Sequence, residues 1–170
     1  MRVEPLSRIT EQDWEQLVDG EQEPWGSLGE GLEWGEKDRN LGLRDDDGRL
    51  IGVAGAVVAR VDVAGTGSFE VVGLGSLFVT SSRRGAALTE SLIAPLLELA
   101  AAMGPERAML FCREQLVPVY SRLGFEPIED PVWIEQPAGR VRMPLAAMWL
   151  ALHLPTDWPP GRVDVAGLPF

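Results

Sequence analysis

The sequence has few of the residues that build covalent cross-links and metal centres. Its 170 residues include one cysteine, Cys112, and one histidine, His153. A single cysteine excludes an internal disulfide, and together with one histidine it cannot complete a tetrahedral zinc site. We therefore expect a fold that is held by its apolar core, without a metal.

Long apolar runs are also absent. The longest, residues 143–152, is too short to cross a bilayer, which takes about 20 residues. The first residues lack the apolar segment of a signal peptide. These observations predict a cytoplasmic protein without a membrane partner.

Positive charge is scarce. Fourteen arginines and a single lysine, Lys37, stand against 26 acidic residues, which gives a net charge of −11. Binding to a nucleic-acid backbone needs clustered basic residues, so this balance argues against a nucleic-acid partner. An acidic surface suits a cationic small molecule, and it equally serves solubility alone.

Apolar and turn segments alternate along the chain without a linker or a repeat, which predicts one domain over residues 1–154 and a Pro/Gly-rich surface tail over 155–170. Thr10 is expected to cap a helix that ends at Val18. The pattern predicts further helices at 85–103 and 115–123, and strands at 2–6, 40–44, 50–64, 69–79, 107–112, 132–135 and 141–152. This order predicts a mixed α/β (α+β) sheet.

The most informative segment joins a buried strand to a helix. Residues 69–79 leave neither face of their strand polar, and Gly73 and Gly75 within it indicate a bulge or a close approach to the backbone. Arg83, Arg84 and Gly85 follow, and a helix begins. Free N–H groups and the helix dipole favour phosphate at such a place, although an ordinary turn with solvated arginines has the same pattern.

Two motifs in this region resemble those of the GNAT superfamily of acyl-CoA-dependent N-acyltransferases. Residues 84–89 are similar to the family's R/Q-x-x-G-x-G/A signature, with Ala87 and Thr89 at the glycine positions. A second register, residues 82–87, places Gly85 correctly but has Ser82 where arginine or glutamine is usual. Residues 120–125, YSRLGF, resemble the family's Y-x-x-x-G-F. The resemblance implies a mostly antiparallel central sheet flanked by helices, with splayed fourth and fifth strands.

The resemblance also implies the donor and its site. Acetyl-CoA is the expected acyl donor, its pantetheine arm lying between the splayed strands and its pyrophosphate resting on the start of the following helix. An amine would then attack the thioester directly. The expected cofactor-binding residues are Leu77, Phe78, Val79, Arg83, Arg84, Gly85, Ala86, Ala87, Leu88 and Thr89.

Tyr120, the only tyrosine, stands at the family's general-acid position. Its reference pKa near 10 keeps it protonated at neutral pH, so it can protonate the leaving thiolate; the alternative role is packing of a short helix. Glu70, at the start of the fourth strand, is the best candidate for a general base, and a solvated carboxylate is its alternative. His153 is expected to be exposed and Cys112 to be a core residue.

The segment between Arg8 and Lys37 contains nine acidic residues and no basic one. In GNAT proteins the corresponding segment forms a wall of the acceptor site. Trp25, Glu30 and Glu33 are therefore the expected substrate-binding residues, which would hold a cationic amine through ion pairs and cation–π contacts. The alternative is a solvated acidic surface with its tryptophans packed inward.

These observations predict an N-acetyltransferase acting on the primary amine of a small cationic acceptor. A homodimer through the apolar last strand is compatible with the pattern. The alternative is a non-catalytic CoA-binding or protein-interaction module that keeps the same scaffold.

Overall fold

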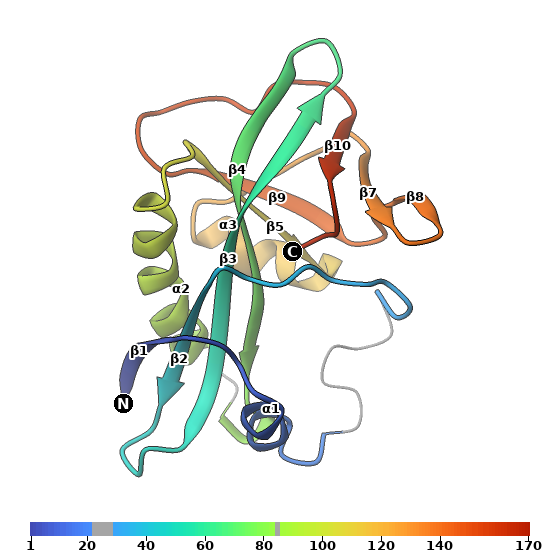
Figure 1. The fold of residues 1–170 in the computed structure, drawn as a ribbon. Helices are drawn as coiled ribbons and strands as arrows, with labels where there is room; N and C mark the ends of the chain where they lie inside the picture. The colour runs from blue at the N-terminus through green and yellow to red at the C-terminus, as the bar shows by residue number, and fades with distance from the viewer. Residues whose placement is uncertain (22–28, 84–85) are drawn as a thin grey trace.

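The computed structural model describes residues 1–21, 29–83 and 86–170, apart from the side chains of residues 86 and 87 (Figure 1). Its helices are α1 (Glu11–Val18), α2 (Ala86–Ala101) and α3 (Val117–Arg122), with short 3-10 turns at Ser81–Arg83 and Glu114–Leu116. Its strands are β1 (Arg2–Leu6), β2 (Arg39–Arg44), β3 (Leu50–Val63), β4 (Gly67–Val79), β5 (Arg107–Cys112), β6 (Glu126–Pro127), β7 (Val132–Gln136), β8 (Gly139–Arg142), β9 (Ala146–Ala151) and β10 (Val163–Ala166).

The strands form one mixed sheet in the order β6-β9-β5-β4-β3-β10-β7-β8. The long strand β3 pairs with β2 along its first half and with β10 near its end, and β1 continues beyond β2. Within the described residues, the parallel pairs are β4 with β5 and β10 with β7. The mixed, mostly antiparallel sheet expected from the sequence is thus confirmed.

Strands β4 and β5 separate halfway along β4. They pair only from Val72 to Leu74 of β4. Beyond this point β4 continues to Val79 paired with β3, its one ladder partner among the described strands there, and Ser76 takes a φ of +53° where the β3–β4 register shifts. A bulge of this kind bends a strand and re-aims its edge. The splayed fourth and fifth strands are therefore confirmed, and the edge of β4 from Gly75 onward has no partner in β5.

Local sequence signals explain the first helix. Thr10 Oγ1 accepts a hydrogen bond from the Asp13 backbone N–H at 3.2 Å, and the Asp13 carboxylate accepts one from the Thr10 backbone N–H at 2.8 Å. This reciprocal capping box satisfies N–H groups that the helix itself leaves free. The hydrogen bonds from Thr10 also hold the pKa of Asp13 below its ordinary value. Leu17 is fully buried against Leu50 and Val53 of β3, so α1 is fixed to the sheet.

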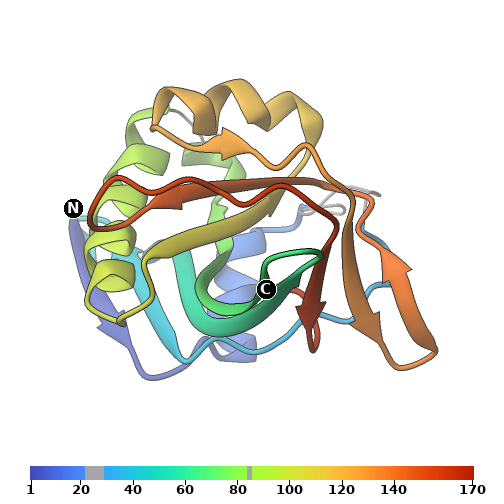
Figure 2. The ribbon, with the colours of Figure 1, turned by 90° about the horizontal axis from the view of Figure 1, so that it is seen from above.

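Separate apolar cores cover the two faces of the sheet. On one face, α2 contributes Leu92 and Leu96 at helical spacing, and α3 contributes Tyr120. On the other face, Met109 and Trp149 pack with the C-terminal residues. Figure 2 shows the end of the chain inside the curve of the sheet, with α2 and α3 outside it. No helix among the described residues is both long and apolar enough to span a membrane.

The C-terminal segment differs from the surface tail that the sequence predicts. Val163 and Val165 of β10 are fully buried, and β10 pairs antiparallel to β3. Phe170 is 3% exposed and stacks on Phe111 of β5 with 4.9 Å between ring centroids. Apolar and polar residues alternate around Asp164, but over only four residues that are flanked by prolines and glycines. Such a short pattern does not predict a strand unless the partner strand is known.

A second difference concerns the strand predicted over residues 141–152. The structure divides it into β8 and β9 at residues 143–145. Pro144 lacks a backbone N–H, which disfavours a continuous ladder at this point. The break lets β8 pair with β7 while β9 crosses to pair with β5.

Replacing Phe170 with alanine is expected to lower the free energy of unfolding by about 3 kcal/mol, because a buried aromatic ring and its contacts are lost. Leu168, 37% exposed, provides the matched control. Leu168→Ala should cost less than about 1 kcal/mol. Urea unfolding of both variants measures the difference, and equally small effects would contradict the packing of this segment.

Candidate functional site

The predicted pantetheine-binding residues occupy the open half of β4. Leu77 is half-buried, whereas Phe78 and Val79 are buried. Phe78 lies under α1, with the Trp14 ring edge-on at 6.1 Å between centroids. Val79 belongs to the core beneath α2. Because the latter two side chains are committed to packing, this stretch has mainly its backbone edge, which does not pair with β5, to offer a ligand.

A tight turn leads from β4 toward α2. The Thr80 backbone N–H donates to the Ile51 carbonyl at 2.9 Å, and the Arg83 N–H donates to the Thr80 carbonyl at 2.9 Å. The Thr80 side chain is 2% exposed, and its hydroxyl has no hydrogen-bond partner in the described part of the chain. A buried hydroxyl without a partner is costly, so this residue is a candidate ligand group. Sequence reasoning missed Thr80, whose only signal is a polar residue directly after a buried strand.

The structure describes only some of the remaining residues that the sequence predicts to bind phosphate. Arg84 and Gly85 lie outside the described residues, as do the side chains of Ala86 and Ala87. Leu88 and Thr89 are half-buried in the first turns of α2. The helix therefore begins where the sequence expects it, close behind the open end of β4.

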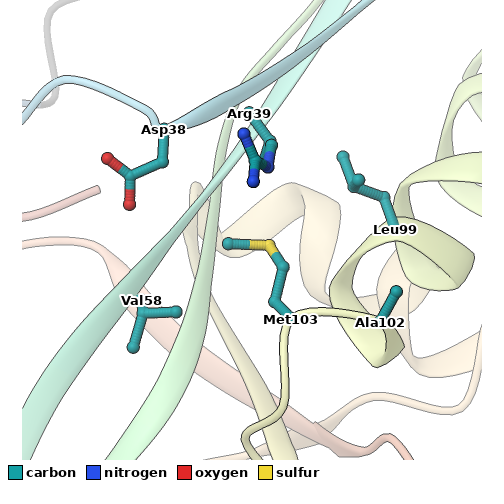
Figure 3. Close-up of a pocket in the computed structure, with 6 residues that line it drawn as sticks. All are labelled: Asp38, Arg39, Val58, Leu99, Ala102 and Met103. Carbon is teal, nitrogen blue, oxygen red and sulfur yellow. The ribbon is translucent and has the colours of Figure 1, made fainter.

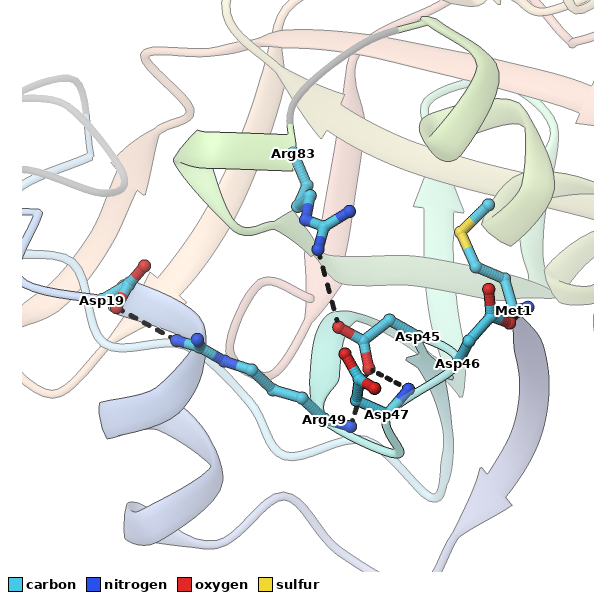
Figure 4. A network of polar contacts seen from close by, with 7 residues as sticks. All are labelled: Met1, Asp19, Asp45, Asp46, Asp47, Arg49 and Arg83. Atoms are coloured by element: carbon cyan, nitrogen blue, oxygen red, sulfur yellow. Dashed lines mark hydrogen bonds and ion pairs between the residues drawn. The ribbon is translucent and has the colours of Figure 1, made fainter.

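Arg83 is held toward the β2–β3 turn (Figure 4). Its guanidinium lies 3.8 Å from the carboxylate of Asp45, which also accepts hydrogen bonds from the backbone N–H groups of Asp47 and Arg49. The Arg83 side chain is 56% exposed and that of Asp45 only 11%, and their 3.8 Å separation is close to the longest at which two groups count as an ion pair. The contact with Asp45 is therefore weak enough to yield to a doubly charged phosphate.

Tyr120 lies in α3 and is 9% exposed. The helix ends in a Schellman motif: the Gly124 N–H donates to the Ser121 carbonyl at 3.0 Å, and the Phe125 N–H donates to the Tyr120 carbonyl at 3.1 Å. Gly124 takes a φ of +92°, and Phe125 meets the Tyr120 ring edge-on at 5.8 Å. The Y-x-x-x-G-F motif thus fixes the ring through local packing.

The electrostatic environment keeps Tyr120 neutral. Burial, with a smaller contribution from Cys112, raises the pKa of its hydroxyl above the ordinary value. Burial, followed by the charge of Glu114, also raises the pKa of Cys112, to about 11. The Cys112 thiol lies 3.9 Å from the Met148 sulfur within the core. A thiol in this state is a poor nucleophile, in keeping with the core role expected for it.

Glu70 and His153 are not brought to this region. Glu70 is exposed and stands opposite Arg60 in the β3–β4 hairpin. Six residues separate it from Ser76, which is about 20 Å along an extended strand. His153 is exposed after the end of β9. The role of Glu70 as a base stays a prediction, and its position is remote from the open half of β4.

The acidic segment before β2 follows the concave face of the sheet. Glu30 and Glu33 are exposed, and Trp25 lies outside the described residues. Gln136 of β7 fixes the backbone of Glu33: its side-chain oxygen accepts from the Glu33 N–H at 2.8 Å, and its amide donates to the Glu33 carbonyl at 3.0 Å. Further along, the Gly35 N–H donates to the Pro169 carbonyl at 2.7 Å. This segment therefore borders the C-terminal residues.

The described residues line hollows at two places that bear on the site. One, of about 500 Å³, lies between the start of β2 and the end of α2 and is lined by Asp38, Arg39, Val58, Leu99, Ala102 and Met103 (Figure 3). It is about 20 Å from the first turn of α2, so it is separate from the predicted phosphate site. The other, of about 350 Å³, lies beside α3 and the start of β9 and includes Glu114, Glu129 and Asp130 with Arg142. Only the second is lined by a residue of α3, Val117, the helix that also carries Tyr120.

Comparison with known proteins gives the family. Residues 6–128, well over half of the chain, match the model of the acetyltransferase (GNAT) domain. Among curated proteins, none matches.

Several solved structures share the fold. YhbS from Escherichia coli, a GNAT family N-acetyltransferase in complex with CoA, is 24% identical over 77% of this chain and 72% of its own, with a TM-score of 0.52. An aminoglycoside 6'-N-acetyltransferase complexed with coenzyme A is 18% identical over 92% and 100%, with a TM-score of 0.60. N-acetylglutamate synthase from Neisseria gonorrhoeae, complexed with coenzyme A and N-acetyl-glutamate, is 15% identical over 91% and 36%, with a TM-score of 0.57. With its family match, its two motifs and its splayed strands, the chain belongs to the GNAT family of acyl-CoA-dependent N-acyltransferases.

Proposed function

We propose that the protein transfers an acetyl group from acetyl-CoA to the primary amine of a small cationic acceptor. The observation that carries this proposal is that β4 separates from β5 beyond Leu74. The separated part of β4 then leads into α2. A thioester arm can enter between the strands and bond to the edge of β4 that β5 does not pair with. Its pyrophosphate then lies at a helix N-terminus, where backbone N–H groups and the helix dipole favour anions.

The surroundings of this edge support the donor. The Thr80 hydroxyl, buried without a partner in the described chain, is a suitable donor to a phosphate or amide oxygen. Arg83 can exchange its long contact with Asp45 for a phosphate, and Arg84 adds a second charge to the sequence at this point. The ungapped register of residues 84–89 has Ala87 and Thr89 at the family's glycine positions, so this motif carries larger residues there than the family pattern.

Tyr120 is proposed as the general acid. The neutral acceptor amine attacks the carbonyl carbon of the thioester, an N–C bond forms and the C–S bond breaks. The thiolate takes the phenolic proton, the nitrogen loses one proton to solvent, and the tyrosinate regains a proton from solvent. The raised pKa of Tyr120 ensures that this proton is present throughout the neutral range. Tyr120 follows β5 in the chain and packs in the same core as Cys112 at the end of that strand, which supports the assignment.

A cationic acceptor is favoured by charge. The protein carries a net charge of −11, and the segment containing Glu30 and Glu33 is fixed against β7 on the concave face. The hollow beside α3 adds Glu114, Glu129 and Asp130 against one arginine. Such a field raises the local concentration of amines that carry several positive charges. The relatives of known structure include enzymes named for an aminoglycoside and for N-acetylglutamate, so the fold by itself selects neither.

The donor is tested by thermal unfolding with saturating acetyl-CoA and, separately, with CoA. A ligand present at about 100 times its Kd adds about 2.7 kcal/mol of stability, which raises the Tm of a domain of this size by about 5–10 °C. No rise at millimolar concentrations of either compound would overturn the proposal.

The same sample is then assayed for release of the CoA thiol from acetyl-CoA. The acceptors compared are a linear polyamine, an alkyl monoamine with no other charged group, and glutamate. We expect the polyamine to react fastest. Binding of acetyl-CoA without thiol release from any amine would favour the non-catalytic module instead.

Tyr120→Phe is expected to lower kcat about 100-fold, the range for loss of a general acid, while leaving the affinity for acetyl-CoA unchanged. Because the pKa of Tyr120 is raised, its ionisation should cause no fall in kcat of the unaltered protein below about pH 10. Ser121→Ala removes an exposed hydroxyl from the same helix and serves as the control. A Tyr120→Phe variant with undiminished kcat would exclude the acid role.

A further inference from the structure

Lys37 is the only lysine in the chain, and none of the roles described above uses it. It precedes β2 and is half-buried on the concave face of the sheet. Its neighbours there are glycines of two paired strands, Gly55 of β3 and Gly75 of β4. A nucleophilic amine therefore lies against the residue at which β4 leaves β5.

The lysine side chain crosses from β3 to β4. A Cβ atom built on Gly55 would lie 2.6 Å from Lys37 Cγ, and one built on Gly75 would lie 2.8 Å from Lys37 Cε. Both separations are shorter than real Cβ contacts, so the two glycines leave the space through which the side chain runs. Nζ is one bond beyond Cε. The amine thus lies at the point where the pairing of β4 with β5 has ended.

Few interactions hold the amine. Lys37 Nζ donates a hydrogen bond to the Gly35 carbonyl at 2.7 Å, and the residues that the structure describes include no ion-pair partner for it. Burial lowers the pKa of Lys37, which raises the fraction of neutral amine at a given pH. The main-chain carbonyl carbon of Phe170 would lie 2.6 Å from the same Cβ atom on Gly75, so the C-terminal segment runs beside the lysine side chain.

We propose that Lys37 is an internal acyl acceptor, whose Nζ takes the acetyl group of acetyl-CoA bound between β4 and β5. This inference rests on the proposed function. The neutral Nζ attacks the thioester carbonyl carbon, an N–C bond forms and the C–S bond breaks. The nitrogen loses one proton, the CoA thiolate gains one, and the products are an N-acetyl-lysine and free CoA.

The N-terminal amine provides an internal comparison. The Met1 amine is paired with Asp46 at the β2–β3 turn, and its residue is exposed. In an unfolded chain an α-amino group is more often neutral at a given pH than a lysine side chain, so acylation without a bound donor favours the α-amino group there. Acylation directed by a bound donor favours Lys37.

The test is to incubate the full chain with acetyl-CoA and to digest it with trypsin. Cleavage after arginine and lysine releases residues 9–37 when Lys37 is free. Acetylation blocks the cut, so the product becomes residues 9–39 with the mass of one added acetyl group. We expect Lys37 to be acetylated at least about tenfold faster than Met1, because the donor is held beside it.

Two controls make the result specific. In Lys37→Met, which keeps an unbranched apolar side chain, the segment 9–39 should gain no acetyl group. In the chain unfolded by urea, Met1 should become the preferred site.

The outcomes separate the two proposals. If acetyl-CoA raises the Tm but only Met1 is modified, Lys37 is not an acceptor and the proposed function stands. If acetyl-CoA causes no rise in Tm, both proposals fail. Equal preference for Lys37 in the folded and the unfolded chain would also overturn the inference.

Discussion

The architecture depends on one interruption of a hydrogen-bond ladder. β4 has a partner on both edges only from Val72 to Leu74, and the bulge at Ser76 turns the rest of the strand away from β5. Backbone N–H and C=O groups left without a ladder need another partner, so an open edge inside a sheet is costly unless a ligand uses it. The proposed donor site uses this gap together with the helix that follows, and the buried hydroxyl of Thr80 lies directly after the end of β4.

The two faces of the open strand serve different purposes. On the convex face, α2 and α3 pack against Val72, Leu74 and Cys112 and fix Tyr120. On the concave face the glycines of β4 replace side chains with space, which Phe170 and Lys37 fill: a Cβ at Gly73 would lie 2.3 Å from the Phe170 ring. The gap between β4 and β5 therefore has the helices α2 and α3 on one side. On the other side it has Lys37 and Phe170, which are distant from each other in sequence.

Features that depend on neighbouring residues could be predicted from the sequence. The capping box of Thr10 and Asp13 and the helical spacing of Leu92 and Leu96 are local patterns, and each appears where expected. The two motifs also placed α2 and α3 correctly relative to the splayed strands. β10 was missed because its four residues gain stability only by pairing with β3, about 100 residues earlier.

The rest of the site could not be anticipated for the same reason. A lone lysine in a loop carries no local signal, and its position follows from glycines on two other strands. The position of Glu70 illustrates the opposite case: it belongs to the expected strand, but the length of the β3–β4 hairpin carries it away from the gap. The φ of +53° at Ser76 has no signal in a serine, although Gly73 and Gly75 mark the bulge nearby.

The burial of Cys112 and Tyr120 couples stability to proton release. Both groups are neutral when protonated, and both have a pKa raised in the folded state. Below the unfolded-state pKa values, near 8.5 for cysteine and 10 for tyrosine, neither group makes the free energy of unfolding depend on pH. As pH rises, the unfolded chain ionises first, Cys112 before Tyr120, and unfolding becomes coupled to the loss of protons. The packing that keeps the tyrosine protonated for its proposed role therefore sets an alkaline limit on the fold.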